Sequence, residues 1–208
     1  MNAFESVAAE LNFFLLSVTN HNPSIFANSI FILFYAISFH FSCAFTTAIR
    51  SFLIKFLSEN NSRDFKRLLS QMFRLGIIIT LIYSALIALF SPMISKYSGA
   101  DEESHRLLMS SLMAGVVYML VDFISVYINM IMPIIQLEDQ LFFLHAFLFM
   151  PCMAFISYLL IIVYRFGLLG AMGSFIIASI VMNLVCYRRI QKVMPMFLKV
   201  NEATELFI

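Results

Sequence analysis

One carboxylate, Asp122, lies near the middle of a long apolar stretch that runs from about residue 107 to 132. An acidic side chain at the centre of a membrane helix costs a few kcal/mol on insertion, so it usually faces a cavity or another helix and has a function. We therefore predict that Asp122 binds a proton, an inorganic cation or a cationic substrate. The alternative that stays open is an aspartate whose hydrogen bonds come from a neighbouring hydroxyl or amide.

Two further carboxylates, Glu5 and Glu10, lie in the first apolar stretch of the chain. Five residues turn a helix by about 140° beyond one full turn, so the two side chains do not share a narrow face and only one needs to line a cavity. Glu5 also fits the first turn of a helix, where acidic residues are favoured. We include both glutamates in the candidate cation site.

Neutral polar residues complete this candidate site. Asn28 and Tyr118 lie within apolar stretches, and Asn129 follows Asp122 by seven residues, on the same helix face two turns along. Tyr35, Tyr127 and His40 are further polar groups at membrane depth, without an assigned role. A lone histidine such as His40 or His145 lacks a second ligand nearby in sequence, so no metal site is predicted.

Enzymatic motifs do not occur in the sequence. It contains no glycine-rich phosphate loop, no HExxH and no GxSxG. The three cysteines are single and show no CxxC spacing. The net charge of +1 gives no reason to expect a nucleic-acid partner. We therefore predict a protein that is not an enzyme and that needs no cofactor other than a coupling ion, H⁺ or Na⁺.

The composition indicates whether the protein is surrounded by water or by lipid. Of the 208 residues, 62% are hydrophobic and 12% are charged, which is wrong for a surface that faces water. We predict an all-α, polytopic membrane helix bundle whose partner is the lipid bilayer. The bundle forms a single lobe over residues 1–192, and a cytosolic tail follows over residues 193–208. The six expected transmembrane helices cover about residues 3–20, 24–57, 64–91, 102–133, 140–164 and 167–187.

The distribution of Lys and Arg predicts the orientation. Ten basic residues fall on the side of the N-terminus and three on the other side. Because cytosolic loops carry the excess of basic residues, both termini are predicted to be cytosolic. The predicted location is the plasma membrane or a vacuolar or other organelle membrane. The ten residues are Arg50, Lys55, Arg63, Lys66, Arg67, Arg74, Arg188, Arg189, Lys192 and Lys199.

Four segments, taken in order, resemble the C-terminal six-helix lobe of the MATE (multidrug and toxin extrusion) transporters, especially their eukaryotic branch. The segments are residues 4–11 with both glutamates, residues 44–50 followed by 58–61 and Lys66, residues 121–122 with residues 135–140 after them, and residues 166–174. The chain departs from the family pattern in several glycines, in Met172 where the family has Trp, and in a third glutamate that is missing near Ile32 or Leu33.

The resemblance implies a function for the candidate residues. MATE proteins are secondary antiporters of two six-helix lobes that export organic cations and other xenobiotics in exchange for H⁺ or Na⁺. Glu5, Glu10 and Asp122 match acidic positions of the second lobe. Protonation of Asp122 or Glu10 would discharge the site and release a bound cation.

One lobe supplies only half of such a cavity, so a second lobe, an N-terminal half or another copy, is expected as a partner. A truncated gene model, a half-transporter and a decayed copy are the three explanations. We favour truncation, because Met1 falls inside the expected start of a helix. The rival interpretation is a non-transporting scaffold or a regulatory partner of a full-length transporter. The missing glycines and the missing third glutamate favour it, and the intramembrane carboxylates argue against it.

Overall fold

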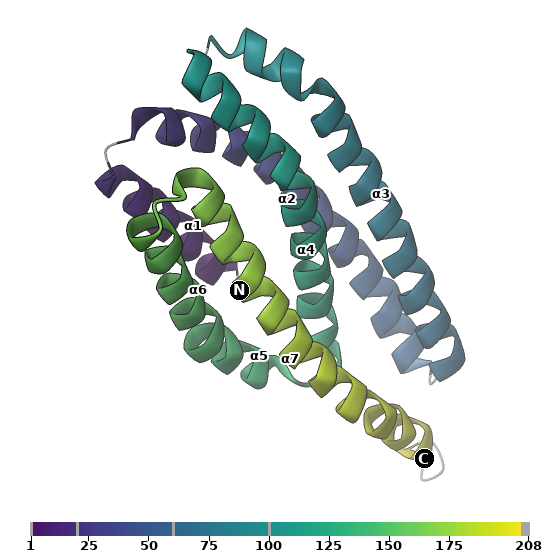
Figure 1. Cartoon of the computed structure of the whole chain (residues 1–208). Helices are drawn as coiled ribbons and strands as arrows, with labels where there is room; N and C mark the ends of the chain where they lie inside the picture. Colours follow the sequence, from purple (N-terminus) through teal and green to yellow (C-terminus); the bar gives the residue numbers. More distant parts are fainter. Residues whose placement is uncertain (1, 20, 60, 100, 205–208) are drawn as a thin grey trace.

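The protein is an all-α helical bundle, as predicted (Figure 1). The computed structural model describes residues 2–19, 21–59, 61–99 and 101–204, and the side chains of these residues between 7 and 199. The helices are α1 (Asn2–Val18), α2 (Asn22–Ser58), α3 (Ser62–Tyr97), α4 (Glu102–Ile134), α5 (Glu138–Leu144), η1 (His145–Phe149), α6 (Met150–Ser157), η2 (Tyr158–Val163) and α7 (Gly167–Thr204). The segments from α5 to η2 follow one another as a single rod with two π-helical turns.

Five helices of the described chain are long and apolar enough to cross a bilayer, so we treat the chain as a membrane protein. The sequence predicted about six such helices. The difference is α1, which has 17 residues and a described apolar part of only Val7–Val18. At a rise of about 1.5 Å per residue, the described apolar part falls short of a hydrocarbon core of about 30 Å.

Helix α3 continues past the predicted stop at Ser91-Pro92 and ends at Tyr97. Pro92 has no N–H, so it cannot donate to the carbonyl of Ala88 one turn earlier. The Ser91 hydroxyl donates to that carbonyl instead, at 2.8 Å. A side chain thus replaces the lost backbone donor, which is a common way for membrane helices to tolerate proline.

Helix α7 also exceeds its predicted range. It passes Tyr187, where the sixth apolar stretch was expected to end, and runs through Pro195 to Thr204. The described part of the predicted tail is therefore a helix that projects from the bundle next to the end of α2 and the start of α3 (Figure 1). The apolar run marks the length inside a membrane, whereas backbone hydrogen bonds set the length of the helix.

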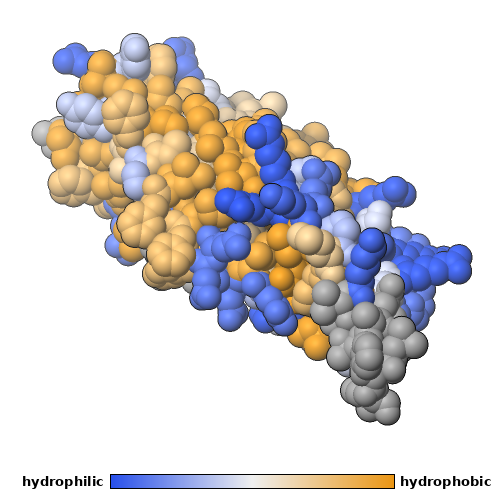
Figure 2. Space-filling view, turned by 90° about the horizontal axis from the view of Figure 1, so that it is seen from below, coloured by the Kyte–Doolittle hydropathy of each residue, from blue (hydrophilic) through white to orange (hydrophobic). Residues whose placement is uncertain are grey.

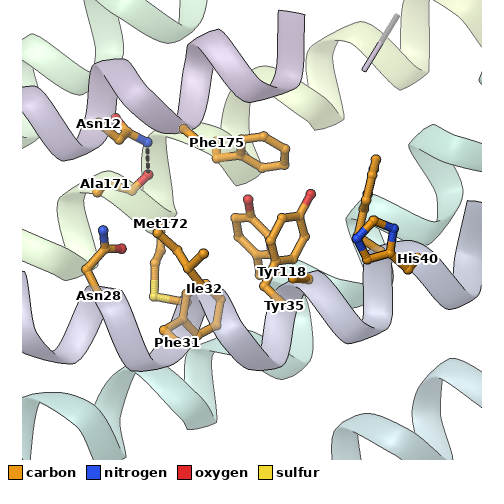
Figure 3. A pocket seen from close by; sticks show the side chains of 13 residues that line it. Asn12, Asn28, Phe31, Ile32, Tyr35, His40, Tyr118, Ala171, Met172 and Phe175 are labelled. Carbon is orange, nitrogen blue, oxygen red and sulfur yellow. Dashed lines mark hydrogen bonds between the residues drawn. The ribbon is translucent and has the colours of Figure 1, made fainter. Parts of the chain in front are cut away.

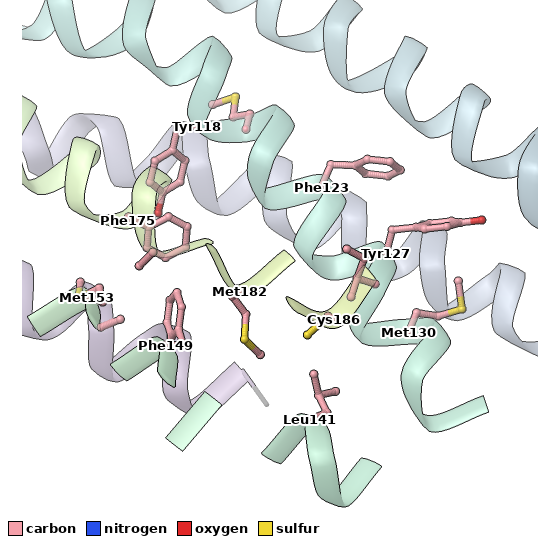
Figure 4. Close-up of a cluster of buried hydrophobic side chains, with 14 of the residues drawn as sticks. Tyr118, Phe123, Tyr127, Met130, Leu141, Phe149, Met153, Phe175, Met182 and Cys186 are labelled. Carbon is pink, nitrogen blue, oxygen red and sulfur yellow. The ribbon is translucent and has the colours of Figure 1, made fainter. Parts of the chain in front are cut away.

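Helix α4 is the central helix of the bundle and packs on α2, α3 and α7. Small residues line these contacts, because lipid tails give little hydrophobic drive for helix association and close backbone approach must supply it. Gly76, Thr80 and Ser84 are buried on α3, and Ser111 and Gly115 are buried on α4. Toward α7 and α6 the packing is bulkier, with aromatic and methionine side chains such as Phe149, Met153, Phe175 and Met182 (Figure 4).

Candidate functional site

Asp122 is buried at the centre of the bundle, with 1% of its surface exposed. The hydroxyl of Tyr35 on α2 donates to its Oδ1 atom at 3.0 Å. This bond joins α2 and α4, which have the most extensive contact of any two helices in the described part of the chain. A carboxylate that accepts a hydrogen bond from a hydroxyl was one of the two possibilities that the sequence left open. Whether Asp122 can also act on a cation depends on the surroundings of Tyr35.

Tyr35 forms part of the wall of a cavity of about 270 Å³ between α1, α2, α4 and α7 (Figure 3). Asp122 itself does not line this cavity but lies one side chain behind its wall, joined to it through Tyr35. Helix α2 supplies most of the lining, because Asn28, Phe31 and Tyr35 recur at spacings of three and four residues on one helix face.

The wall next to Asp122 is aromatic. The ring of Tyr118 on α4 stacks on Phe175 of α7 with centroids 4.6 Å apart, and it meets the ring of Tyr35 edge to face at 4.9 Å. Phe31 meets Tyr118 edge to face at 5.5 Å. These rings line one apolar space, and aromatic walls of this kind suit a cation with an organic surface, which the electron-rich ring faces attract.

Amide groups line the opposite part of the cavity. Asn28 is buried, with 7% of its surface exposed. Asn12 on α1 donates from Nδ2 to the carbonyl oxygen of Ala171 on α7 at 3.1 Å, which fastens α1 to α7 beside the cavity (Figure 3). The Oδ1 atom of Asn12 is buried and accepts no hydrogen bond from any residue that the structure describes.

The structure brings three of the six predicted site residues together. Asn28 and Tyr118 line the cavity and Asp122 lies behind it. Glu10 is exposed on α1 and is not in the lining, although its neighbour Ala9 is. The side chain of Glu5 lies outside the described residues.

Asn129, the sixth predicted residue, belongs to a separate polar cluster between α4, η1 and α7. A small cavity of about 10 Å³ there is lined by Asn129, Ser125, His145 and Asn183 among others. Asn183 donates to the hydroxyl of Ser125 at 3.0 Å, and His145 bonds the carbonyl oxygen of Leu141 at 2.9 Å. Asn129 lies two turns after Asp122, nearer the C-terminal end of α4.

The predicted set did not include Asn12, Tyr35 and Phe175. The recurrence of Asn28, Phe31 and Tyr35 on one face is visible in the sequence and would have added Tyr35. Asn12 and Ala171 are 159 residues apart, and no pattern in the sequence predicts their contact.

No group of three or more His, Cys, Asp or Glu side chains within the described part of the chain is placed to hold a metal ion. No known protein family, no curated protein and no solved structure matches this chain. The local chemistry of the cavity is therefore the basis for a functional assignment.

Proposed function

We propose that the chain is a lobe of a MATE-like secondary antiporter that binds small organic cations and exports them in exchange for H⁺ or Na⁺. The observation that carries this proposal is the aromatic cavity with the Asp122 carboxylate held directly behind its wall by Tyr35. The apolar helices that surround it supply the membrane setting that a transporter needs.

The cavity favours an organic cation over other small ligands. A quaternary or protonated amine gains attraction from the faces of aromatic rings and from a carboxylate in a medium of low dielectric constant. A volume of about 270 Å³ is close to the lower end of ligand pockets, so it admits a small amine or part of a larger drug-like cation.

Competition between a proton and the cation would provide the coupling. When Asp122 takes up a proton, its negative charge disappears and the attraction for a cation in the cavity weakens. Linkage makes this effect reciprocal, so a bound cation opposes protonation to the same extent. Affinity for the cation is therefore expected to rise with pH as Asp122 loses its proton, which is the sign that H⁺/cation exchange requires.

Alternating access requires a second body against which this lobe can move. In the proposal, that partner is an N-terminal lobe or a second copy, and the ligand binds between the two. Glu10, which is exposed on α1, is free to face such a partner.

The aromatic wall gives a first test by ligand binding. Replacing Phe175 with leucine removes one ring of the stack with Tyr118 but keeps an apolar side chain of similar reach. A desolvated cation–π contact contributes enough to make the expected loss about tenfold for a quaternary ammonium ligand. Affinity for the uncharged carbon analogue of the same shape is expected to stay unchanged, and isothermal titration of the purified chain measures both.

A matched control is Phe155→Leu, which changes an exposed phenylalanine on α6 that does not line the cavity. Equal losses for the charged and the uncharged ligand in Phe175→Leu would contradict a cation site at this wall.

Transport is tested in sealed vesicles with an imposed pH gradient. The chain, alone or with a second lobe supplied, is expected to move a fluorescent organic cation against the flow of protons. If binding is intact but neither arrangement moves the cation, transport is contradicted and the regulatory-partner interpretation is favoured.

A further inference from the structure

We infer that the groove between α3 and α7 at the basic end of the molecule binds an anionic phospholipid, with an acyl chain along α4 and the lipid phosphate on Lys66. We call this groove the α3–α7 groove. It has a volume of about 520 Å³ and is distinct from the cavity beside Asp122. The residues that line it are Lys66, Leu69, Ser70 and Phe73 on α3, Ile124, Tyr127, Ile128 and Ile131 on α4, and Tyr187, Ile190, Gln191, Met194 and Pro195 on α7.

The shape of the groove follows from the arrangement of the helices. α3 and α7 each pack on α4, but they do not pack extensively on each other. They therefore leave a channel with α4 as its floor, and the last turns of α4 place Ile124, Ile128 and Ile131 along that floor. The one hydroxyl on the floor, that of Tyr127, donates to the carbonyl oxygen of Leu69. Because this polar group already has its hydrogen bond, the channel presents an apolar surface that suits an acyl chain.

The mouth of the groove is cationic. Lys66 lines it, and Arg63 lies three residues earlier on the same face of α3. No described carboxylate lies within ion-pair distance of either side chain. Nearby acidic groups have other partners: Asp64 accepts from the Asn61 side chain at 2.7 Å, and Glu59 lies 3.9 Å from Lys55. An unneutralised cation beside an apolar channel favours a ligand that combines an anion with a hydrocarbon chain.

The extent of the apolar stretches indicates that the groove lies at the depth of the headgroups. The apolar stretch of α3 begins after Arg74, and that of α7 ends near Tyr187, so both walls of the groove leave the hydrocarbon region here. Tyr187 accepts a hydrogen bond from Gln191 at 2.7 Å, and a tyrosine at this depth is typical of a membrane interface. Figure 2, a view from below, shows hydrophilic side chains gathered over one half of the face, with hydrophobic surface between them.

An anionic phospholipid uses both features at once. Basic residues near a membrane surface attract anionic headgroups, and pockets between helices on that side hold them. Free inorganic phosphate could meet only the lysine, and a zwitterionic lipid would gain less from it. The expected ligand is therefore a lipid with net negative charge.

The test compares lipid binding by the 208-residue chain and three variants. The purified chain in detergent is titrated with phosphatidylglycerol or phosphatidylcholine, and native mass spectrometry counts the bound lipid. Phosphatidylglycerol is expected to bind more tightly than phosphatidylcholine. Lys66→Gln is expected to weaken its binding about tenfold, since a hydrogen bond to a charged group is lost.

Two further variants distinguish binding of the lipid headgroup from binding of the acyl chain. Ile124→Trp places a larger side chain in the channel and leaves Lys66 unchanged, so it is expected to reduce binding of both lipids. Lys96→Gln removes an exposed lysine at the other end of α3 and is expected to leave lipid binding unchanged. Circular dichroism confirms that each variant remains helical.

Three outcomes would overturn the proposal. Equal affinity for the two lipids would exclude selection by charge. Equal losses in Lys66→Gln and Lys96→Gln would reduce the effect to general surface charge. Displacement of phosphatidylglycerol by millimolar inorganic phosphate would show a phosphate site that does not use the groove.

Discussion

Asp122→Asn is expected to weaken the binding of an organic cation by about 100-fold and to remove the dependence of binding on pH. Asparagine has nearly the same shape, and its carbonyl oxygen can still accept the hydrogen bond that Tyr35 donates at 3.0 Å. The variant therefore keeps the packing between α2 and α4 and loses only the charge. A cation on the cavity side of the Tyr35 hydroxyl would lie roughly 6 Å from the carboxylate, where two unit charges attract by about 2.8 kcal/mol at an effective dielectric constant of about 20, or about 100-fold in affinity.

Two measurements separate this loss of charge from damage to the fold. Thermal unfolding in detergent is expected to give nearly the same midpoint as the parent chain, because asparagine keeps the shape of the side chain and still accepts the hydrogen bond from Tyr35. Titration of a quaternary ammonium ligand at several pH values is expected to show rising affinity with pH in the parent and a flat profile in Asp122→Asn.

A matched control on the same helix is Glu102→Gln, which neutralises an exposed carboxylate in the first turn of α4. Its binding curve is expected to follow that of the parent. If Asp122→Asn also bound the ligand with the affinity and pH dependence of the parent, Asp122 would be a structural residue and the proposed antiport would lose its coupling group.

Gly76→Ala is expected to produce the largest loss of stability among the glycine substitutions inside helices. A methyl group at this position would collide with the ring of Phe123 and come within 2.9 Å of Cε1 of Phe45. Phe123 is completely buried between α3 and α4, so its ring has little room to move away. Overpacking of this kind costs about 1–3 kcal/mol. The midpoint of thermal unfolding is expected to fall by several degrees.

Gly173→Ala on α7 is the matched control. Its new methyl group would lie 3.5 Å from Cδ1 of Leu160, which is ordinary van der Waals contact. Because alanine is favoured over glycine in a helix by up to about 1 kcal/mol, this variant is expected to be neutral or slightly stabilised. If Gly76→Ala unfolded at the same temperature as Gly173→Ala, the close approach of α3 and α4 at Gly76 would be wrong.

The sequence by itself determined the class of fold and its solvent. Long apolar stretches with few charges leave no alternative to helices in lipid, because unsatisfied backbone groups are too costly in hydrocarbon. The same argument singled out Asp122, since a carboxylate in an apolar stretch has no solvent-based reason to be there. Helix ends were harder to predict from the sequence. The pattern indicated that α3 stops at Pro92, but the Ser91 hydroxyl donates to the Ala88 carbonyl and the helix continues.

Only the tertiary structure decided which polar residues meet. Asp122 and Tyr35 are 87 residues apart, and Asn12 and Ala171 are 159 apart. Periodicity gives the face on which a side chain lies, but not the helix that packs against that face. For this reason Asn28, Tyr118 and Asp122 come together, while Asn129, on the same helix as Asp122, lies in another cluster. Which helices pack together depends on the fit of the small residues along the whole interface, and the order of residues in the sequence does not show that fit.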